Sequence, residues 1–189
     1  MQAEFDVELD WRGFELHPEI PAGGLPLVEM FGAERVARMR PYLLDFAKAQ
    51  GVTGMVVPAR KPNTRKALAL AEWARDRGRL HEIRTALMDA YWRSGLDIED
   101  DAVLARVADD AGLAGSEGAA AIRESRAPEI LARVAAMGRD AAAAGVTGIP
   151  TFDIGGERVV GAQPYPVLAE AMVRQGGRPR APVSAPRRS

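Results

Sequence analysis

The chain of 189 residues contains no cysteine. This absence excludes disulfide bonds, thiolate metal sites and thiol catalysis by the chain's own residues. The only two histidines, His17 and His81, lie far apart in the sequence, so a histidine-rich metal centre is not expected. The sequence therefore predicts no metal site, and it offers no catalytic nucleophile of the thiol type.

The chain also has no excess of one charge and no long apolar run. The net charge is −1, so no overall field attracts nucleic acid or membrane. No apolar run reaches the roughly 18 residues of a membrane helix. The first ten residues are acidic and alternating, which does not resemble a secretory signal. We therefore expect a cytoplasmic protein without nucleic-acid or membrane partners, and its 47% hydrophobic content is typical of a globular domain.

Two segments show the alternation of a β-strand. Near the N-terminus, Phe5, Val7, Leu9 and Trp11 alternate with acidic residues, which predicts a strand over residues 5–14. Near the C-terminus, a strand over residues 151–154 and a second over 158–160 flank Gly155-Gly156, a typical hairpin turn.

Between these strands the apolar spacing is helical. Pro41 predicts a kink in, or a division of, the helix over residues 32–50. Further helices are expected from Asn63 or Thr64, around residues 83–91, 103–111 and 116–125, from Pro128, and finally from Pro164. We predict a core of residues 1–24 and 145–175, an all-helical insertion over 25–144, and a disordered tail over 176–189.

Four segments together resemble the DsbA family of thioredoxin-like proteins, and its FrnE-like oxidoreductase branch in particular. This family is related to the 2-hydroxychromene-2-carboxylate isomerases and the kappa-class glutathione transferases. The segments are Trp11-Arg12-Gly13-Phe14-Glu15-Leu16-His17-Pro18-Glu19-Ile20-Pro21, Pro62-Asn63-Thr64, Gly145-Val146-Thr147-Gly148-Ile149-Pro150-Thr151-Phe152 and Gly161-Ala162-Gln163-Pro164. The resemblance implies an α/β thioredoxin-like fold with an all-helical insertion.

The resemblance also implies where a substrate would bind. Pro150 would follow a cis peptide bond, Ile149 would present its backbone to an extended substrate, and Thr147 and Gly148 would set the turn. Asn63 is a further candidate for substrate binding, because in glutathione-using relatives an asparagine in the corresponding region faces the ligand. Gln163 is another, because its backbone N–H at a helix start suits an anion such as a glutathione carboxylate. Residue chemistry alone offers simpler readings: a trans proline at a strand start, and helix capping at Asn63 and beside Gln163.

One part of the family pattern has no match. Members carry a first strand and a Cys-x-x-Cys motif that begins the active-site helix, and this chain lacks both, so we expect it to be inactive in redox chemistry. Three functions stay open. They are a thiol–disulfide oxidoreductase seen without its active-site segment, a glutathione-dependent isomerase or transferase, and a non-catalytic module that binds a peptide or protein partner. Protein thiols or disulfides are the implied substrates, and a homo-oligomer would cover the incomplete sheet.

Overall fold

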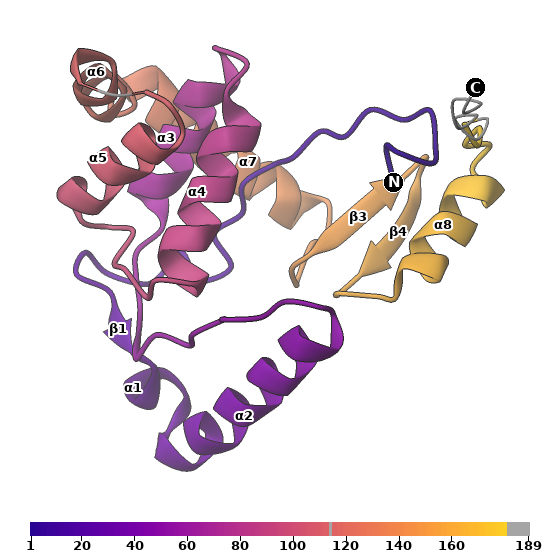
Figure 1. Ribbon diagram of the computed structural model, residues 1–189, viewed down its shortest axis with the longest axis horizontal. Coiled ribbons are helices and arrows are strands. Elements are labelled where there is room, and N and C mark those ends of the chain that lie inside the picture. The colour runs from indigo at the N-terminus through magenta and orange to yellow at the C-terminus, as the bar shows by residue number, and fades with distance from the viewer. Residues whose placement is uncertain (114, 181–189) are drawn as a thin grey trace, which may run out of the picture. The chain divides into compact units, whose positions relative to one another are not determined.

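Helices form most of the regular structure in the described part of the chain, and alanine, leucine and valine at helical spacing fill most of their buried positions. The structure, a computed structural model, describes residues 1–113 and 115–180. It divides into a helical unit, His17–Arg139, and a hairpin unit, which combines Met1–Leu16 with the chain from Asp140 onward. The helices are α1 (Leu27–Phe31), α2 (Ala33–Ala49), α3 (Arg65–Arg75), α4 (Leu80–Trp92), α5 (Asp101–Asp110), α6 (Ser116–Glu124), α7 (Pro128–Ala143) and α8 (Tyr165–Arg174) (Figure 1).

The core of the helical unit lies among α3 to α7. Its most deeply buried large side chains are Leu70, Ile83, Leu104, Val107 and Leu113. Glycines follow the helices where the sequence predicts stops, as at Gly78, which has a φ of 67° that favours glycine. The side chain of Asp100 accepts a hydrogen bond from the Ala102 N–H at 2.8 Å and so caps α5.

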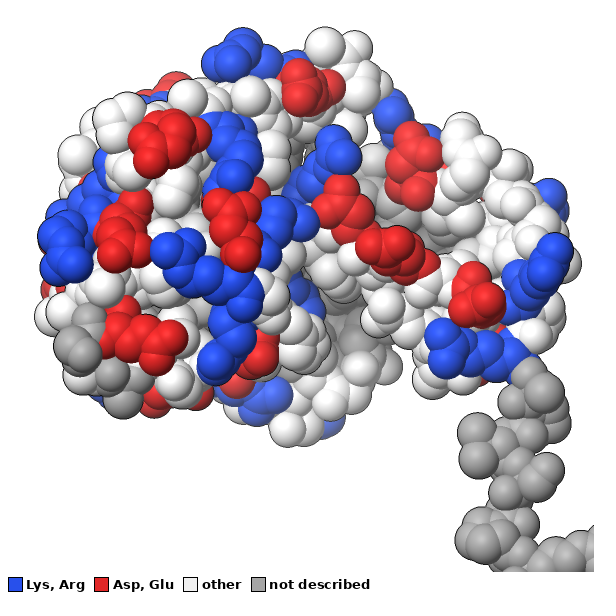
Figure 2. All heavy atoms as spheres, turned by 90° about the horizontal axis from the view of Figure 1, so that it is seen from above, with Lys and Arg blue, Asp and Glu red and all other residues white. Residues whose placement is uncertain are grey.

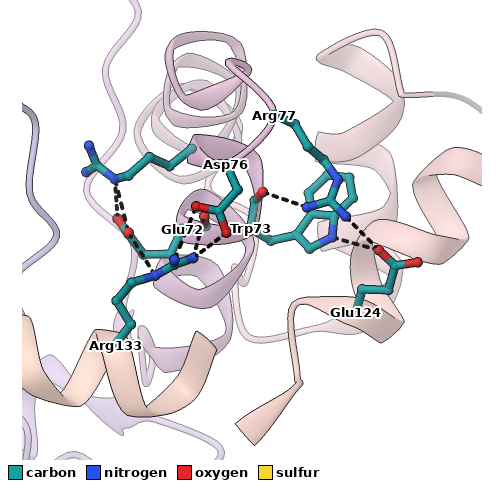
Figure 3. Close-up of polar contacts among 7 residues, drawn as sticks. Glu72, Trp73, Asp76, Arg77, Glu124 and Arg133 are labelled. Carbon is teal, nitrogen blue, oxygen red and sulfur yellow. Dashed lines mark hydrogen bonds and ion pairs between the residues drawn. The ribbon is translucent and has the colours of Figure 1, made fainter. Parts of the chain in front are cut away.

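A cluster of charged side chains surrounds Glu72 on α3. Glu72 is only 3% exposed, and its carboxylate lies 3.0 Å from Arg75 Nε and 3.6 Å from Arg133 Nε (Figure 3). Arg133 comes from α7 and also holds Asp76 at 2.8 Å. A buried carboxylate is costly unless it is paired, and these two arginines supply the compensation.

The helical unit also contains a small sheet that the sequence did not predict. Strand β1 (Leu25–Pro26) pairs antiparallel with β2 (Arg60–Lys61). The preceding loop is bound to this unit, because Asn63 Nδ2 donates to the Ile20 carbonyl at 2.7 Å and Gly23 N–H donates to Glu99 at 2.9 Å. We assigned residues 17–24 to the thioredoxin-like core, and these contacts group them with the helices instead.

The hairpin unit contains β3 (Thr151–Ile154), β4 (Glu157–Val160) and α8 (Figure 1). The two strands match the predicted positions, with β4 beginning one residue earlier than expected. Among the described residues of this unit, the buried apolar side chains are Phe5, Leu168, Ala171 and Met172. This is a small core for a sheet of two strands.

The predicted strand over residues 5–14 is wrong. Only Phe5 forms a bridge, antiparallel to Pro179, and residues 6–14 join no strand in the described part of the chain. A strand is stabilised by ladder hydrogen bonds to a neighbour, which alternation alone cannot supply. The same bridge corrects part of the predicted disordered tail, because Arg180 N–H donates to the Glu4 carbonyl at 2.7 Å. Residues 181–189 lie outside the described residues.

The predicted division at Pro41 is also wrong. Helix α2 continues through Pro41 from Ala33 to Ala49, and the interruption lies at Gly32, where φ is 81°. A proline removes one helical hydrogen bond, whereas a positive φ breaks the helical path itself.

The surface carries both signs of charge. On the face seen in Figure 2, basic and acidic side chains are interspersed without a large patch of one sign. Within the described residues, no helix is both long enough and apolar enough to cross a membrane.

Candidate functional site

The turn that leads into β3 begins where α7 ends. Gly145 has a φ of 73°, its N–H donates to the Ala142 carbonyl, and the next N–H, of Val146, donates to the Ala141 carbonyl, both at 2.9 Å. These paired bonds are those of a glycine-terminated helix. The chain then turns through Thr147 and Gly148 to Ile149 and Pro150.

The peptide bond between Ile149 and Pro150 is cis, the form that the family resemblance implies. Directly after it, Thr151 Oγ1 donates to the Gly148 carbonyl at 2.7 Å and closes the turn. Ile149 is 55% exposed, and Thr147 and Pro150 are exposed as well. The turn therefore presents its predicted substrate-facing residues to solvent.

The register of the hairpin determines which backbone N–H and C=O groups of β3 form hydrogen bonds with β4. Ile154 faces Glu157 across the two-residue turn Gly155-Gly156, and Phe152 faces Val159. In an antiparallel hairpin, hydrogen-bonded and non-hydrogen-bonded pairs alternate, and the pair beside a two-residue turn is hydrogen-bonded. The bond from Gly161 N–H to the Pro150 carbonyl, 2.8 Å, agrees with this alternation.

It follows that Thr151 and Asp153 direct their N–H and C=O groups away from β4. In the part of the chain that the structure describes, β3 pairs with β4 alone. These groups therefore form a free strand edge in line with Ile149 and Pro150. The Asp153 side chain points to the turn, where its Oδ1 accepts from Gly156 N–H at 3.1 Å, and it lies 3.6 Å from Arg158.

Gln163 lies at the same end of the hairpin as Pro150. Its side-chain Nε2 donates to the Val160 carbonyl at 2.9 Å, and its backbone N–H donates to the Gly161 carbonyl at 2.9 Å. Both donors are thus engaged within the chain, and the backbone N–H that we expected to be available to an anion is occupied.

Asn63 belongs to the helical unit. Its Oδ1 accepts from Arg65 N–H at 3.0 Å at the start of α3, and its Nδ2 donates to the Ile20 carbonyl. The N-cap position of α3 is Thr64, so the Asn63 side chain binds the first N–H of the helix from one residue before the cap and also fixes the preceding loop.

Exposed apolar side chains lie beside the turn. Val160 is 49% exposed, and a side chain at Gly148 would contact it at 3.6 Å. At the opposite end of β4, a hydrogen bond from Arg174, with one from Gln175, lowers the pKa of the Glu157 carboxyl. Among the described residues no group of His, Asp or Glu could hold a metal ion.

The sequence did not indicate Thr151 and Asp153 as candidate site residues. Their candidacy rests on backbone N–H and C=O groups, so their side chains gave no indication. The Gly155-Gly156 turn did indicate these positions, because it fixes the register of the hairpin. The register in turn determines which residues of β3 direct their backbone groups away from β4.

Comparison with known proteins agrees on the fold. A family model described as a DSBA-like thioredoxin domain matches residues 1–173. A crystal structure of a probable DsbA oxidoreductase from Streptomyces coelicolor is similar, with 27% identity, a TM-score of 0.77, and coverage of 95% of this chain and 80% of that one. No curated protein matches. The predicted thioredoxin-like α/β fold is thereby confirmed.

Proposed function

Because the chain belongs to the family of DsbA-like thioredoxin domains, we propose that it binds extended polypeptide segments along the free edge of β3, beside Ile149 and Pro150. The binding resembles substrate capture by a thiol–disulfide oxidoreductase, but this chain performs no thiol exchange, because it has no cysteine to form a mixed disulfide. The proposal requires no cofactor.

The free edge of β3 is the observation that carries this proposal. Thr151 and Asp153 offer backbone donors and acceptors at strand spacing, and an extended peptide satisfies them by strand addition. The backbone bonds provide affinity for many sequences. Exposed Ile149 and Val160 favour peptides with apolar side chains next to the turn. The glutathione-dependent alternative gains no support, since Asn63 and Gln163 are engaged in internal hydrogen bonds.

A pair of substitutions at Asp153 tests the role of the strand edge. Asp153→Ala removes the side-chain bond to Gly156 but keeps the backbone N–H, whereas Asp153→Pro removes that N–H as well. Neither change touches the ladder bonds of Phe152 and Ile154. Since one hydrogen bond contributes about 0.5–1.5 kcal/mol, Asp153→Pro is expected to bind about two- to tenfold more weakly than Asp153→Ala.

Fluorescence anisotropy with a labelled, carboxymethylated insulin B chain measures the two affinities. Circular dichroism establishes that both variants are folded. Equal affinities of the two variants, or no binding by the unsubstituted chain, would overturn strand addition at this edge.

The absence of thiol exchange is tested separately. In the reduction of insulin by dithiothreitol, the chain is expected to leave the rate of precipitation at its uncatalysed value. An accelerated rate from cysteine-free protein would contradict the proposal, whatever the peptide affinity.

A further inference from the structure

A cavity of about 480 Å³ lies between α4 and α5, which pack side by side in the helical unit (Figure 1). This volume falls within the roughly 300–1,000 Å³ of small-molecule sites in proteins. The start of α4 lies close to the end of α5, because the side chain of Arg79, the N-cap of α4, donates to the carbonyl of Ala111, the C-cap of α5. The cavity is therefore formed by facing surfaces of two helices within one unit.

The buried side of this cavity is apolar. Alanines one turn apart on α4 face small and branched side chains of α5, and a leucine from the connecting loop lies between the two helices. All of these residues belong to the hydrophobic core or pack against it, and they are Ala86, Ala90, Leu96, Val103, Val107 and Ala111. Because alanine fills little of the space between two helices, this side can receive the apolar side chains of a ligand.

Two of the carboxylates that line the cavity are paired within the chain. Glu82 lies 3.3 Å from Arg79 Nε. Asp89 lies 2.7 Å from Arg93 Nε. Their charges are compensated by neighbours on the same helix, so they contribute little net field to a ligand.

Two charges of opposite sign are left without a partner. Arg106 and Asp110 line the cavity from α5 and are exposed, and neither forms a hydrogen bond or an ion pair with any residue that the structure describes. They are four residues apart, so their Cβ atoms lie about 5–6 Å apart on one face of the helix. The hydroxyl groups of Thr85 and Ser94 also line this cavity. The polar side of the cavity thus offers one cation, one anion and two hydroxyl groups.

We propose that this cavity binds dipeptides that have apolar side chains and free termini. The Arg106 guanidinium donates to the ligand carboxylate, whose geometry it matches, and the Asp110 carboxylate accepts from the ligand ammonium. In an extended dipeptide the terminal nitrogen and the carboxyl carbon are roughly 5–6 Å apart by standard backbone dimensions, which matches the spacing on α5. The two charged groups of a single amino acid share one Cα and are much closer together. The peptide bond can be hydrogen-bonded by the hydroxyl of Thr85 or Ser94.

Capped forms of one dipeptide test the role of each charge. Amide NMR shifts are followed during titration with leucyl-leucine, with its N-acetylated form and with its C-amidated form. The free dipeptide is expected to bind about three- to fivefold more tightly than either capped form, as for other exposed ion pairs. The shifts should be largest for Ala86 and Val107. Equal affinities of the three forms, or no shift changes at millimolar dipeptide, would overturn the proposal.

Matched substitutions assign each terminus to its partner. Arg106→Gln should abolish the preference over the amidated form alone, and Asp110→Asn should abolish the preference over the acetylated form alone. Asp109→Asn makes the same change of charge one residue outside the cavity, so it should leave all three affinities unchanged. Each variant's amide spectrum shows that it is folded. If Arg106→Gln or Asp110→Asn leaves the preferences intact, the assignment is wrong.

Two further titrations define the ligand and its place. Leucine alone should bind more weakly than leucyl-leucine, and equal binding would exclude recognition of a dipeptide. Asp153→Pro, which alters the edge of β3, should leave the affinity for leucyl-leucine unchanged. A loss in that variant would place the dipeptide at β3 and contradict a site between α4 and α5. The result is thus independent of polypeptide binding at β3.

Discussion

Replacing Trp73 by alanine is expected to lower the free energy of unfolding of the helical unit by about 3–5 kcal/mol, the usual cost of truncating a large buried aromatic side chain. Trp73 is 2% exposed within the core of α3 to α7. Its indole Nε1 donates to Glu124 on α6 at 3.0 Å (Figure 3). The ring also lies 4.0 Å from the guanidinium of Arg77, which binds the same carboxylate at 3.0 Å. Truncation therefore leaves a cavity and removes one hydrogen bond between α3 and α6.

Trp73→Phe separates packing from hydrogen bonding. The phenyl ring keeps most of the buried area but cannot donate to Glu124. Because the Glu124 side chain is 44% exposed and can be rehydrated, this loss should cost only about 1 kcal/mol. Urea denaturation followed by circular dichroism measures both changes. Losses of equal size in the two variants would show that the hydrogen bond, and not the packing, dominates.

Gly24→Ala is expected to destabilise the helical unit by about 3 kcal/mol, through strain together with a steric clash. The residue has a φ of 66°, and a Cβ there would lie 2.5 Å from the Lys61 carbonyl oxygen and 3.1 Å from Pro62 Cα. Both contacts are with backbone, so the β1–β2 pair would have to separate to make room.

The adjacent glycine provides a matched control. Gly23 also has a positive φ, 87°, but a Cβ there would meet nothing within 4 Å. Gly23→Ala should therefore cost only the conformational strain, about 1 kcal/mol. The difference in urea midpoint between the two variants reports the clash. If the two midpoints coincide, close packing of the loop against β2 is not what fixes Gly24.

Much of the fold could be predicted because its signals are local. Helical spacing, glycine stops and the Gly155-Gly156 turn depend on neighbours along the chain, and α3, α6, α7, β3 and β4 lie close to the predicted positions. The strand over residues 5–14 failed for the opposite reason. Its alternation describes which side chains are apolar, whereas a strand requires a partner that only the folded chain can supply.

The turn at the candidate site was likewise visible in advance, whereas its contact with a substrate stays a prediction. Residues 147–150 were predicted as a substrate-facing turn from a motif, and they are contiguous in sequence. Asn63 and Gln163 were offered as ligand contacts, yet Asn63 Nδ2 donates to the distant Ile20 carbonyl and Gln163 Nε2 donates to the Val160 carbonyl three residues earlier. The free edge of β3 depends on which strands pair, so it also required the structure.

The sequence by itself determined that these 189 residues supply no thiol group, since the amino-acid composition fixes which reactive groups exist. It also determined the helices and the hairpin, because short-range periodicity and turn chemistry select them. Only the tertiary structure decided that Glu72 is buried close to Arg75 and Arg133. Burial and pairing arise from contacts between distant segments, and these set the energy of a charge in a way that residue type alone does not.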